Sequence, residues 1–404
     1  LFAWRYFWSQ KSTNAINIIA WVSMTAIVVG AGALIVVLSV FNGFEDLVKS
    51  LYSTFYTDLK VLPANGKTLR LSEEQLKQLR SFNGVKAFSL VAEDKALLQN
   101  GELQSLVYMK GVDGNYTKVA GVQNYMLSGK FNLGNRDYPS LVMGAGVENA
   151  LGAQSERDVL PLTAYVFRRG NTVELANPLQ SLSSANLSES GSFLIQQDFD
   201  NKYVLTNIDF VKMMLQWDPD EYSGIEIAVS NTDQAKKVQH GLQQLLGKNY
   251  SVLTRYEQNQ SLYRVMQMEK WVIYAILSLI LAVAAFNMIG ALTMLVMEKQ
   301  KDIQVLKAIG ANDKRIQRIF LSEGLLIAFL GAGLGALLAM ILCWLQVKYH
   351  LVPLQGGSFV VNYYPVKVQW TDLALVILTV MVVALLASWF PARKAAMQSI
   401  ELKS

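Results

Sequence analysis

The sequence predicts a membrane protein with four transmembrane helices and a large extracytoplasmic α+β domain inserted between the first and second helices. Of the 404 residues, 52% are hydrophobic and 17% are charged, whereas soluble domains usually contain about 25% charged residues. Each of four charge-free stretches is long enough to span a bilayer, which needs about 20 helical residues. These stretches are Ser12 to Phe44, Trp271 to Met297, Gly324 to Val347 and Leu373 to Ala392. The about 225 residues between the first two suffice for one or two folded domains.

The charge-free stretches and the strand patterns together predict the following segments, given in chain order. They are an interfacial helix at 1–11, a first span at 12–42, an extracytoplasmic domain at 43–269 with a strand-rich insertion at about 115–222, a second span at 270–297, a coupling loop at 298–320, a third span at 321–347, a short outer loop at 348–370, a fourth span at 371–392 and a tail at 393–404.

Lysine and arginine beside the spans predict the orientation. The loop 298–320 and the tail 393–404 are rich in these residues, whereas the segment 348–370 has only two lysines. Because cytoplasmic loops carry the excess of positive charge, we expect both termini and the loop 298–320 in the cytoplasm and the domain outside. Residues 1–11 mix aromatic and basic side chains, which predicts a helix on the cytoplasmic leaflet, with an ordinary aromatic belt as the alternative.

The outer domain contains two segments with a strand–helix–strand pattern. The first comprises a strand at 58–62, a helix from Ser72 and a strand at 85–92, and the second a strand from Gly224, a helix at about 231–246 and a strand at 250–253. Ser72 followed by two glutamates is a typical helix N-cap. Asn100-Gly101 predicts a hairpin turn between two further strands. Together these segments predict an α+β sandwich.

No chemistry-bearing constellation is found in the sequence. The single cysteine, Cys343, lies within a span and cannot form a disulfide framework or a cysteine metal site. We interpret His240 as a surface residue of an amphipathic helix. Gly144-Ala-Gly146 lacks the third glycine of a dinucleotide site and is interpreted as a turn before a short helix. Basic residues outnumber acidic ones only outside the domain, so the pI of about 9.0 reflects the membrane part and not a nucleic-acid partner.

The spans predict a transporter part without its own motor. They lack the ionisable residues that mark ion pathways, and the chain has no GxxxxGK[ST] phosphate loop, so we expect no ATP hydrolysis by the chain itself. Glycines at 30, 32, 331, 333 and 335 predict close helix packing. Asn287, polar at mid-span, is expected to bridge to a neighbouring helix, with a ligand contact as the alternative.

Three motifs carry a resemblance to a known family. They are LSVFNGFE (Leu38 to Glu45), NMIGALTMLVMEKQKDIQVLKAIGANDKRIQRIF (Asn287 to Phe320) and ASWFPARKAA (Ala387 to Ala396). The chain resembles the permease of the lipoprotein-releasing (Lol) ABC transporter, within a wider four-span class that includes macrolide-efflux and cell-division permeases. More loosely, VYMKGVD (Val107 to Asp113) and LVMGAGVENALG (Leu141 to Gly152) match the family's outer domain.

The resemblance implies a function and a set of partners. The expected role is to extract lipoproteins from the outer leaflet of the bacterial inner membrane and pass them to a periplasmic lipoprotein carrier. The expected partners are a cytoplasmic ABC ATPase dimer, which binds the ATP, a sister permease or a second copy of the chain, and membrane lipid. No cofactor is expected in the chain itself.

Two other readings remain open. An efflux-type permease would act on a periplasmic adaptor through its outer domain, and a cell-division-type module would activate a wall hydrolase. Both belong to the same wider class of four-span permeases, so their partners distinguish them.

The cytoplasmic loop is the predicted ATPase-coupling element. Ile303, Leu306, Ala308 and Ile309 form an apolar side of a short helix, and Gly310 is expected to end it before Asp313 caps the next one. A solvated interfacial helix is the alternative. The predicted coupling residues are Lys299, Ile303, Leu306, Lys307 and Gly310.

The lipoprotein cavity is predicted on the first two spans. Each of these spans carries residues at helical spacing that predict a cavity-lining face, but a lipid-facing or bundle-facing stripe has the same pattern. The predicted residues are Gly30, Ala33, Leu34, Val37, Val40 and Phe41 on the first span, and Tyr274, Leu277, Leu281, Ala284 and Met288 on the second.

A hairpin in the insertion is the predicted carrier-docking element. The strand ending at Arg168 and Arg169, the turn Gly170-Asn171 and the strand from Thr172 have a hairpin pattern. In the family that the chain resembles, one permease recruits the carrier with a protruding loop at about this place. The two arginines would complement an acidic patch. An ordinary surface hairpin is the alternative.

Overall fold

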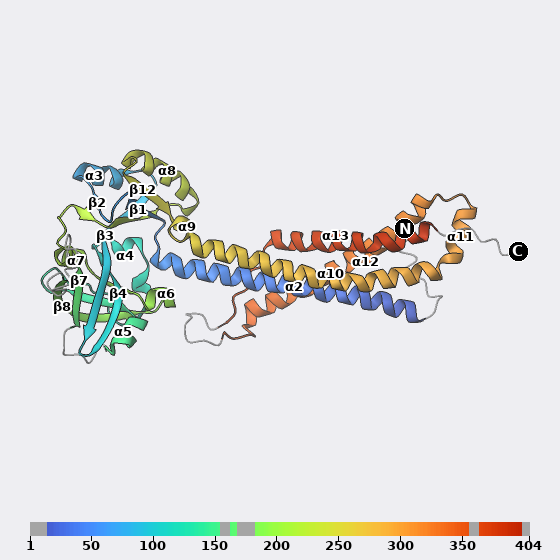
Figure 1. Cartoon of the computed structure of the whole chain (residues 1–404), viewed down its shortest axis with the longest axis horizontal. Helices are drawn as coiled ribbons and strands as arrows, with labels where there is room; N and C mark the ends of the chain where they lie inside the picture. Colours follow the sequence, from blue (N-terminus) through green and yellow to red (C-terminus); the bar gives the residue numbers. More distant parts are fainter. Residues whose placement is uncertain (1–13, 154–161, 168–181, 355–362, 398–404) are drawn as a thin grey trace, which may run out of the picture. The chain divides into compact units, whose positions relative to one another are not determined.

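The computed structural model describes residues 14–153, 162–167, 182–354 and 363–397 (Figure 1). The chain forms two compact units. The described parts of 1–47, 264–354 and 362–404 make up the transmembrane unit, and those of 48–263 make up the extracytoplasmic unit.

Four long apolar helices form the transmembrane unit and confirm the predicted fold class. Each is long and apolar enough to cross a membrane. They are α2 (Asn14–Phe55), α10 (Gln260–Glu298), α12 (Asp313–Tyr349) and α13 (Trp370–Ala396), and a short helix, α11 (Gln300–Ala308), lies between α10 and α12. Buried apolar side chains from all four long helices form one cluster, so the helices pack as a bundle.

The helices are longer than the spans expected from charge. Helix α2 continues beyond residue 42 to Phe55, α10 begins ten residues before 270 at Gln260, and α12 begins at Asp313, inside the expected loop 298–320. The physical reason is that charge-free length reports the thickness of the bilayer, whereas a helix continues into water until a capping or breaking residue ends it.

The extracytoplasmic unit contains twelve strands and seven α-helices or helical turns that begin and end within its described residues, together with two 3₁₀ turns. The strands are β1 (Leu59–Pro63), β2 (Leu69–Arg70), β3 (Val85–Asn100), β4 (Leu103–Val112), β5 (Met126–Gly129), β6 (Ser140–Gly144), β7 (Leu162–Phe167), β8 (Leu182–Phe193), β9 (Tyr203–Asn207), β10 (Glu221–Tyr222), β11 (Gly224–Val229) and β12 (Tyr250–Thr254). The helices are α3 (Glu73–Ser81), α4 (Tyr116–Val119), α5 (Ala145–Leu151), α6 (Gln197–Asp200), α7 (Ile208–Leu215), α8 (Ala235–Leu246) and α9 (Arg255–Gln258).

Both predicted strand–helix–strand segments are confirmed. Their strands pair in the order β12-β1-β11-β3, and α3 and α8 pack against strands of this sheet (Figure 1). The side chain of Ser72 accepts a hydrogen bond from the Gln75 amide in a capping box. Gly101 has φ 58° in the turn that joins β3 to β4, which the Asn-Gly pair predicted.

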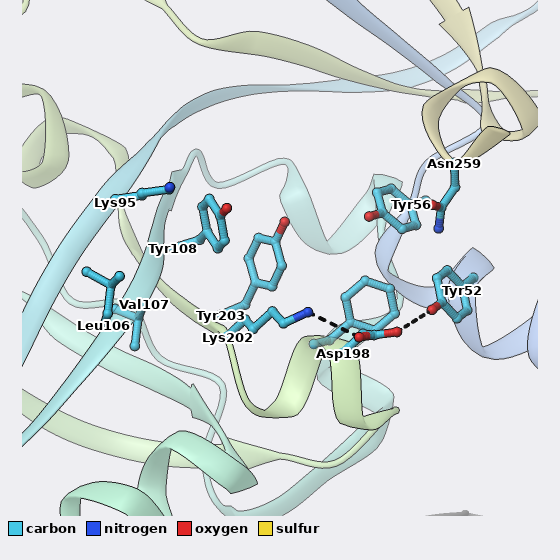
Figure 2. Close-up of a pocket in the computed structure, with 11 residues that line it drawn as sticks. Tyr52, Tyr56, Lys95, Leu106, Val107, Tyr108, Asp198, Lys202, Tyr203 and Asn259 are labelled. Carbon is cyan, nitrogen blue, oxygen red and sulfur yellow. Dashed lines mark hydrogen bonds and ion pairs between the residues drawn. The ribbon is translucent and has the colours of Figure 1, made fainter. Parts of the chain in front are cut away.

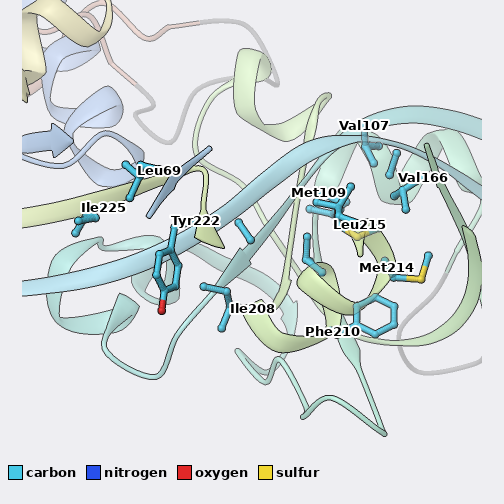
Figure 3. Packing of buried hydrophobic residues seen from close by; sticks show 14 of the residues in the cluster. Leu69, Val107, Met109, Val166, Ile208, Phe210, Met214, Leu215, Tyr222 and Ile225 are labelled. Atoms are coloured by element: carbon cyan, nitrogen blue, oxygen red, sulfur yellow. The ribbon is translucent and has the colours of Figure 1, made fainter. Parts of the chain in front are cut away.

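The insertion closes a ring of strands, which the sequence did not predict. Strand β3 pairs with both β4 and β7, and the path β4-β9-β6-β8-β7 returns to β3. Helix α7 contacts β3, β4, β7, β8 and β9. Its Phe210, Met214 and Leu215 are buried in one cluster with Val107 and Val166 of the strands (Figure 3). The ring therefore has a side-chain core that α7 supplies in part.

A buried carboxyl group lies at the C-terminal end of α6. Asp200 is buried, and its side chain accepts a hydrogen bond from the Ile195 amide at 2.9 Å. Burial raises the pKa of Asp200 from 3.8 to about 6, because a charged carboxylate is less stable away from water. The unfolded chain loses this proton at a lower pH than the folded chain does. Folding stability therefore falls as the pH rises from about 4 to about 6 and stays lower above that.

The variant Asp200→Asn is expected to be more stable than the parent at pH 7.5, by about 1–2 kcal/mol, and to show no gain near pH 4. The amide oxygen can still accept the Ile195 hydrogen bond, while the ionisation cost is removed. The thermal midpoint of the full chain in detergent, measured at both pH values, checks this. A gain at pH 4 that equals or exceeds the gain at pH 7.5 would contradict it.

Candidate functional site

Small residues bring α2 and α12 into close contact. A Cβ on Gly32 would lie 3.3 Å from the Gly335 carbonyl oxygen, and one on Gly335 would lie 2.6 Å from the Val28 carbonyl oxygen. A Cβ on Gly331 would lie 2.9 Å from Ile27. The predicted packing role is confirmed for these three glycines, because any larger side chain would push the helices apart.

The residues predicted to line a cavity on α2 do not share one environment. Leu34 is buried within the bundle, and a Cβ on Gly30 would lie 3.1 Å from Leu281. Val40 and Phe41 are half-buried, whereas Ala33 and Val37 are exposed. Together with Val29, the last two form an exposed stripe at steps of four.

The residues predicted on α10 face the chain's own helix bundle. A bundle-facing stripe was the alternative to a cavity-lining one, because both have the same spacing. Leu281, 2% exposed, and Met288 are buried in the cluster of the four helices. Leu277 packs against the same cluster, Ala284 is half-buried, and the Tyr274 hydroxyl hydrogen-bonds the Thr379 hydroxyl of α13. Spacing of three and four identifies a face but not what covers it.

The opposite face of α10 is exposed and carries one polar side chain. Val283 is 60% exposed, and Leu279 and Phe286 are exposed as well. Asn287 is exposed on the same face, and only its backbone carbonyl bonds a neighbouring helix, accepting from the Ser23 hydroxyl at 3.2 Å. The expected bridging by the Asn287 side chain is therefore not found among the described residues. A polar amide on such a face suits a contact with a partner or a ligand better than plain lipid.

A hydrogen-bonded ion pair joins three helices near the boundaries of their charge-free stretches. The Lys270 ammonium of α10 lies 2.9 Å from both an Asp372 carboxylate oxygen of α13 and the Asn42 side-chain oxygen of α2. The Asn42 amide donates to Asp372 at 2.6 Å. Lys367 pairs with Asp46 of α2, and the Lys367 backbone amide donates to the Ser39 backbone carbonyl at 2.9 Å. All these groups belong to the transmembrane unit.

Of the three side chains Asn42, Lys270 and Asp372, only Asn42 lies in a motif that the sequence analysis identifies, LSVFNGFE. Lys270 and Asp372 belong to none of the identified motifs. The available signal was their position, because each is the last charged residue before a charge-free stretch and the two have opposite signs.

Breaking the Lys270–Asp372 pair is expected to destabilise the transmembrane unit. The variant Asp372→Asn leaves a part-buried ammonium without its counter-charge, at a cost of about 1–3 kcal/mol. Thermal unfolding in detergent should show a lower midpoint. Lys270→Asp combined with Asp372→Lys restores the pair and should recover most of the loss. Equal losses in the single and exchanged variants would show that the pair does not join the helices.

The short helix α11 is fixed to α12 and α13. Ile303, 1% exposed, is buried with Ile316 and Phe320 of α12 and Ala392 and Ala395 of α13. The Lys307 ammonium donates to the Ala396 carbonyl at 2.7 Å and pairs with Asp313 at 2.9 Å. These two predicted coupling residues therefore hold the helix to its own chain.

The outer surface of the coupling element differs from the expected one. Ile309 is 79% exposed, Val305 is also exposed, and Leu306 is half-buried. Lys299 pairs with Asp302 at 3.6 Å. Gly310 has φ 95° and follows the end of α11, as predicted. The expected cap at Asp313 is wrong, because Asn312 occupies the N-cap position and Asp313 begins α12.

Two predicted elements lie outside the described residues. They are the interfacial helix at 1–11 and the docking pair Arg168 and Arg169.

The extracytoplasmic unit contains a tyrosine-lined pocket of about 520 Å³. In Figure 2 its side chains follow one another from Leu106 and Lys95, past Tyr108, Tyr203 and Lys202, to Asp198, Tyr52, Tyr56 and Asn259. The Tyr108 and Tyr203 rings stack with centroids 5.3 Å apart. Burial raises the pKa of Tyr56 and Tyr203, so both hydroxyls stay protonated at neutral pH. We call this site the tyrosine pocket.

One carboxylate of the tyrosine pocket is held in its charged form. Asp198 accepts a hydrogen bond from the Tyr52 hydroxyl at 2.7 Å and pairs with Lys202 at 3.1 Å. These contacts lower the pKa of Asp198, since both favour the carboxylate. No group of three or more His, Cys, Asp or Glu side chains that could hold a metal ion occurs in the described part of the chain.

Comparison with known proteins agrees with this architecture. The family described as MacB-like periplasmic core domain matches residues 20–245, and the family described as FtsX-like permease C-terminal matches residues 274–400. The periplasmic region of MacB from Actinobacillus actinomycetemcomitans has a TM-score of 0.36 and 11% identity, covering 54% of this chain and 98% of that chain. That score is too low to carry any conclusion.

The fold and these matches define a four-span permease with a periplasmic α+β domain. The match to the MacB-like periplasmic core domain covers more than half of the residues of this chain. The chain therefore belongs to the family with that domain. The lipoprotein-releasing system transmembrane protein LolE of Haemophilus influenzae is 25% identical and covers 98% of this chain and 96% of its own. LolC of Neisseria meningitidis is 27% identical, covering 97% and 95%. The resemblance to the lipoprotein-releasing permeases is therefore confirmed along nearly the whole chain.

Proposed function

We propose that the chain is a permease subunit of an ABC transporter that releases lipoproteins from the bacterial inner membrane. The observation that carries this proposal is the likeness to LolC and LolE over both the membrane helices and the periplasmic domain, with 97–98% of the chain covered. The multi-pass membrane location with a periplasmic domain agrees with it. In the proposal, the termini and the 298–320 loop are cytoplasmic.

The proposed partners supply the phosphate loop that is not found in this sequence and cover the apolar side chains that its helices expose. A cytoplasmic ABC ATPase dimer binds ATP and supplies the energy. A sister permease or a second copy of this chain completes the membrane part, and a periplasmic carrier receives the lipoprotein. Burying an acyl chain is worth about 0.8 kcal/mol per CH₂, so a lipoprotein with several chains leaves the membrane too slowly without a motor.

Helix α13 supports a mechanical link between the motor side and the periplasmic side. Near its C-terminal end, Ala392 and Ala395 pack on Ile303 of α11. Near its N-terminal end, Asp372 pairs with Lys270. The 27 residues of α13 make a helix about 40 Å long. Movement of α11 therefore reaches the periplasmic ends of the helices through one packed element.

The exposed faces of α2 and α10 are the proposed route for the cargo's lipid. Val29, Ala33 and Val37 on α2 and Val283 and Phe286 on α10 are apolar and uncovered by their own chain. A lipoprotein enters beside these faces and leaves when the helices move. Among the cavity residues predicted from the sequence, this proposed route gives Ala33 and Val37 direct contact with the lipoprotein. Leu281 and Met288 instead pack within the helix bundle.

The variant Ile309→Asp is expected to lower co-purification of the ATPase. It places a charge on the most exposed apolar side chain of the coupling element, where a partner groove would have to bury it at a cost of several kcal/mol. Val305→Asp should act in the same direction. The measurement is the amount of ATPase retained on tagged full-length chain.

Met397→Asp is the matched control, because Met397 is also apolar and exposed and lies at the end of α13, on the same predicted side of the membrane. It should retain the ATPase. Equal retention by Ile309→Asp and the parent, with transport unchanged, would remove the coupling role from this surface.

Photocrosslinking probes at Val37 and Val283 are expected to capture lipoprotein in cells. Both side chains are exposed on the faces proposed to receive the lipid. A probe at Leu342, which is exposed on α12, serves as the control and should capture much less. Capture at Leu342 that matches Val37 and Val283 would indicate contact with any lipid-facing surface. Capture of a periplasmic adaptor and no lipoprotein would favour the efflux-type reading.

A further inference from the structure

The tyrosine pocket adjoins a strand edge that no described strand covers. The register pairs Leu103 with Asn100 across a two-residue turn, so the odd-numbered residues of β4 exchange hydrogen bonds with β3 and the even-numbered ones face away. In agreement, the Tyr108 amide donates to the Lys202 carbonyl at 2.7 Å on the β9 side. Strand β9 begins at Tyr203, opposite Tyr108, and runs parallel to β4. The backbone of Gln104 and Leu106 therefore lies before the start of β9 and is not paired with it.

This open edge is suited to an extra strand. Leu106 is 66% exposed and Gln104 is exposed as well. Within the described ranges, no backbone or side-chain group hydrogen-bonds the outward backbone of either residue. Peptides that bind in extended form use such unpaired amides and carbonyls to extend a sheet, and an edge of this kind attracts other chains when it stays bare.

The tyrosine pocket is charged and polar in a way that favours acidic ligands. The Lys95 ammonium lies 5.8 Å from the Tyr108 ring centre and has no carboxylate within ion-pair distance among the described residues. Lys202 and Asp198 neutralise each other at an exposed position. The Tyr108 and Tyr203 hydroxyls have no hydrogen-bond partner in the described part of the chain. The site therefore offers a positive charge, hydroxyl donors and two stacked rings (Figure 2).

The nearby carboxylates do not reverse this charge. Glu226 pairs with Lys110 at 2.8 Å and with Lys60 at 3.6 Å, and Glu93 pairs with Lys60 at 3.8 Å. Two carboxylates thus face two ammonium groups, and Lys95 remains the uncompensated charge of the described pocket lining.

We propose that the open edge of β4 and the tyrosine pocket together bind an extended, acidic segment of the cargo's polypeptide. The segment adds a strand beside Gln104 and Leu106, an acidic side chain reaches Lys95, and apolar parts lie on the tyrosine rings. The inference rests on the proposed function, which supplies a cargo with a lipid part and a polypeptide part. The transmembrane unit handles the lipid, and this site holds the protein.

The first test measures binding of short synthetic peptides to the full chain in lipid nanodiscs by fluorescence anisotropy. One labelled peptide is rich in Asp and Glu, and its partner has Asn and Gln instead. The acidic peptide should bind more tightly, with an affinity that falls as salt rises. Lys95→Glu with Lys202→Glu should weaken the acidic peptide by about fivefold or more and leave the neutral one nearly unchanged.

A second variant tests the strand edge. Leu106→Pro removes only an outward amide, so β4 keeps its bonds to β3, and both peptides should weaken by about fivefold. Lys237→Glu, at an exposed lysine of α8, is the matched control and should bind as the parent does. Equal affinity for the acidic and neutral peptides, or unchanged binding in the lysine variants, would overturn the proposal.

Photocrosslinking in cells separates this inference from the proposed function. Probes at Leu106 should capture the cargo's polypeptide, while probes at Val37 capture lipoprotein on the membrane helix. Capture at Val37 without capture at Leu106 would refute the polypeptide site and leave the proposed function standing. Capture of the carrier at Leu106 would also refute it. Absence of lipoprotein at both positions would refute the proposed function itself.

Discussion

The pairing of Lys270 with Asp372 is the interaction on which the arrangement of the transmembrane unit depends. A bilayer tolerates few charges, and those that occur near it must be paired or must reach water. Here the two charges lie on different helices, each directly before a charge-free stretch, and the buried Asn42 of α2 hydrogen-bonds both of them. Three helices are thereby joined on the periplasmic side of the transmembrane unit, while glycines such as Gly32 and Gly335 bring α2 and α12 into close contact.

The same helices give the chain a rigid connection at the other end. Ile303 is buried between α12 and α13, and Lys307 bonds the last carbonyl of α13. Because α11 is held by its inner face, its outer apolar side chains, Val305 and Ile309, are exposed. In the proposed function, a motor that moved this short helix would also move α13, whose N-terminal end carries Asp372 of the ion pair. The proposed lipid extraction, driven by a separate ATPase, needs such a link.

The sequence predicted the features of this arrangement that have a short-range signal, and it did not predict those that depend on contacts between distant residues. Charge-free length predicted four helices, and local patterns such as the Ser72 cap and the Asn100-Gly101 turn predicted the strand–helix–strand segments, because these signals are short-range. The ring of strands depends on the pairing of β3 with β7. These two strands are far apart in the sequence, so no local pattern predicts that they pair. For the same reason the spacing of Leu281 and Met288 identified a helix face but not the helices that cover it.

The residues that the sequence missed follow the same rule. Lys270 and Asp372 are ordinary charges at span boundaries until folding places them 2.9 Å apart. The tyrosine pocket gathers Tyr52, Tyr108 and Tyr203 from α2, β4 and β9, and none of them stands out by spacing. The coupling residues were predicted as a group because a short amphipathic helix is a local pattern. Which of its faces is buried required the tertiary structure.

The most direct measurement of the central claim is release in a reconstituted system. The chain, its sister permease or a second copy, and the ATPase are placed in lipid vesicles that contain a fluorescent triacylated lipoprotein, with the periplasmic carrier added outside. Lipoprotein should appear in a soluble complex with the carrier only when ATP is present. If ATP is hydrolysed but the lipoprotein stays in the vesicles, while a small amphiphile is expelled once a periplasmic adaptor is added, the chain is an efflux permease and this account is wrong.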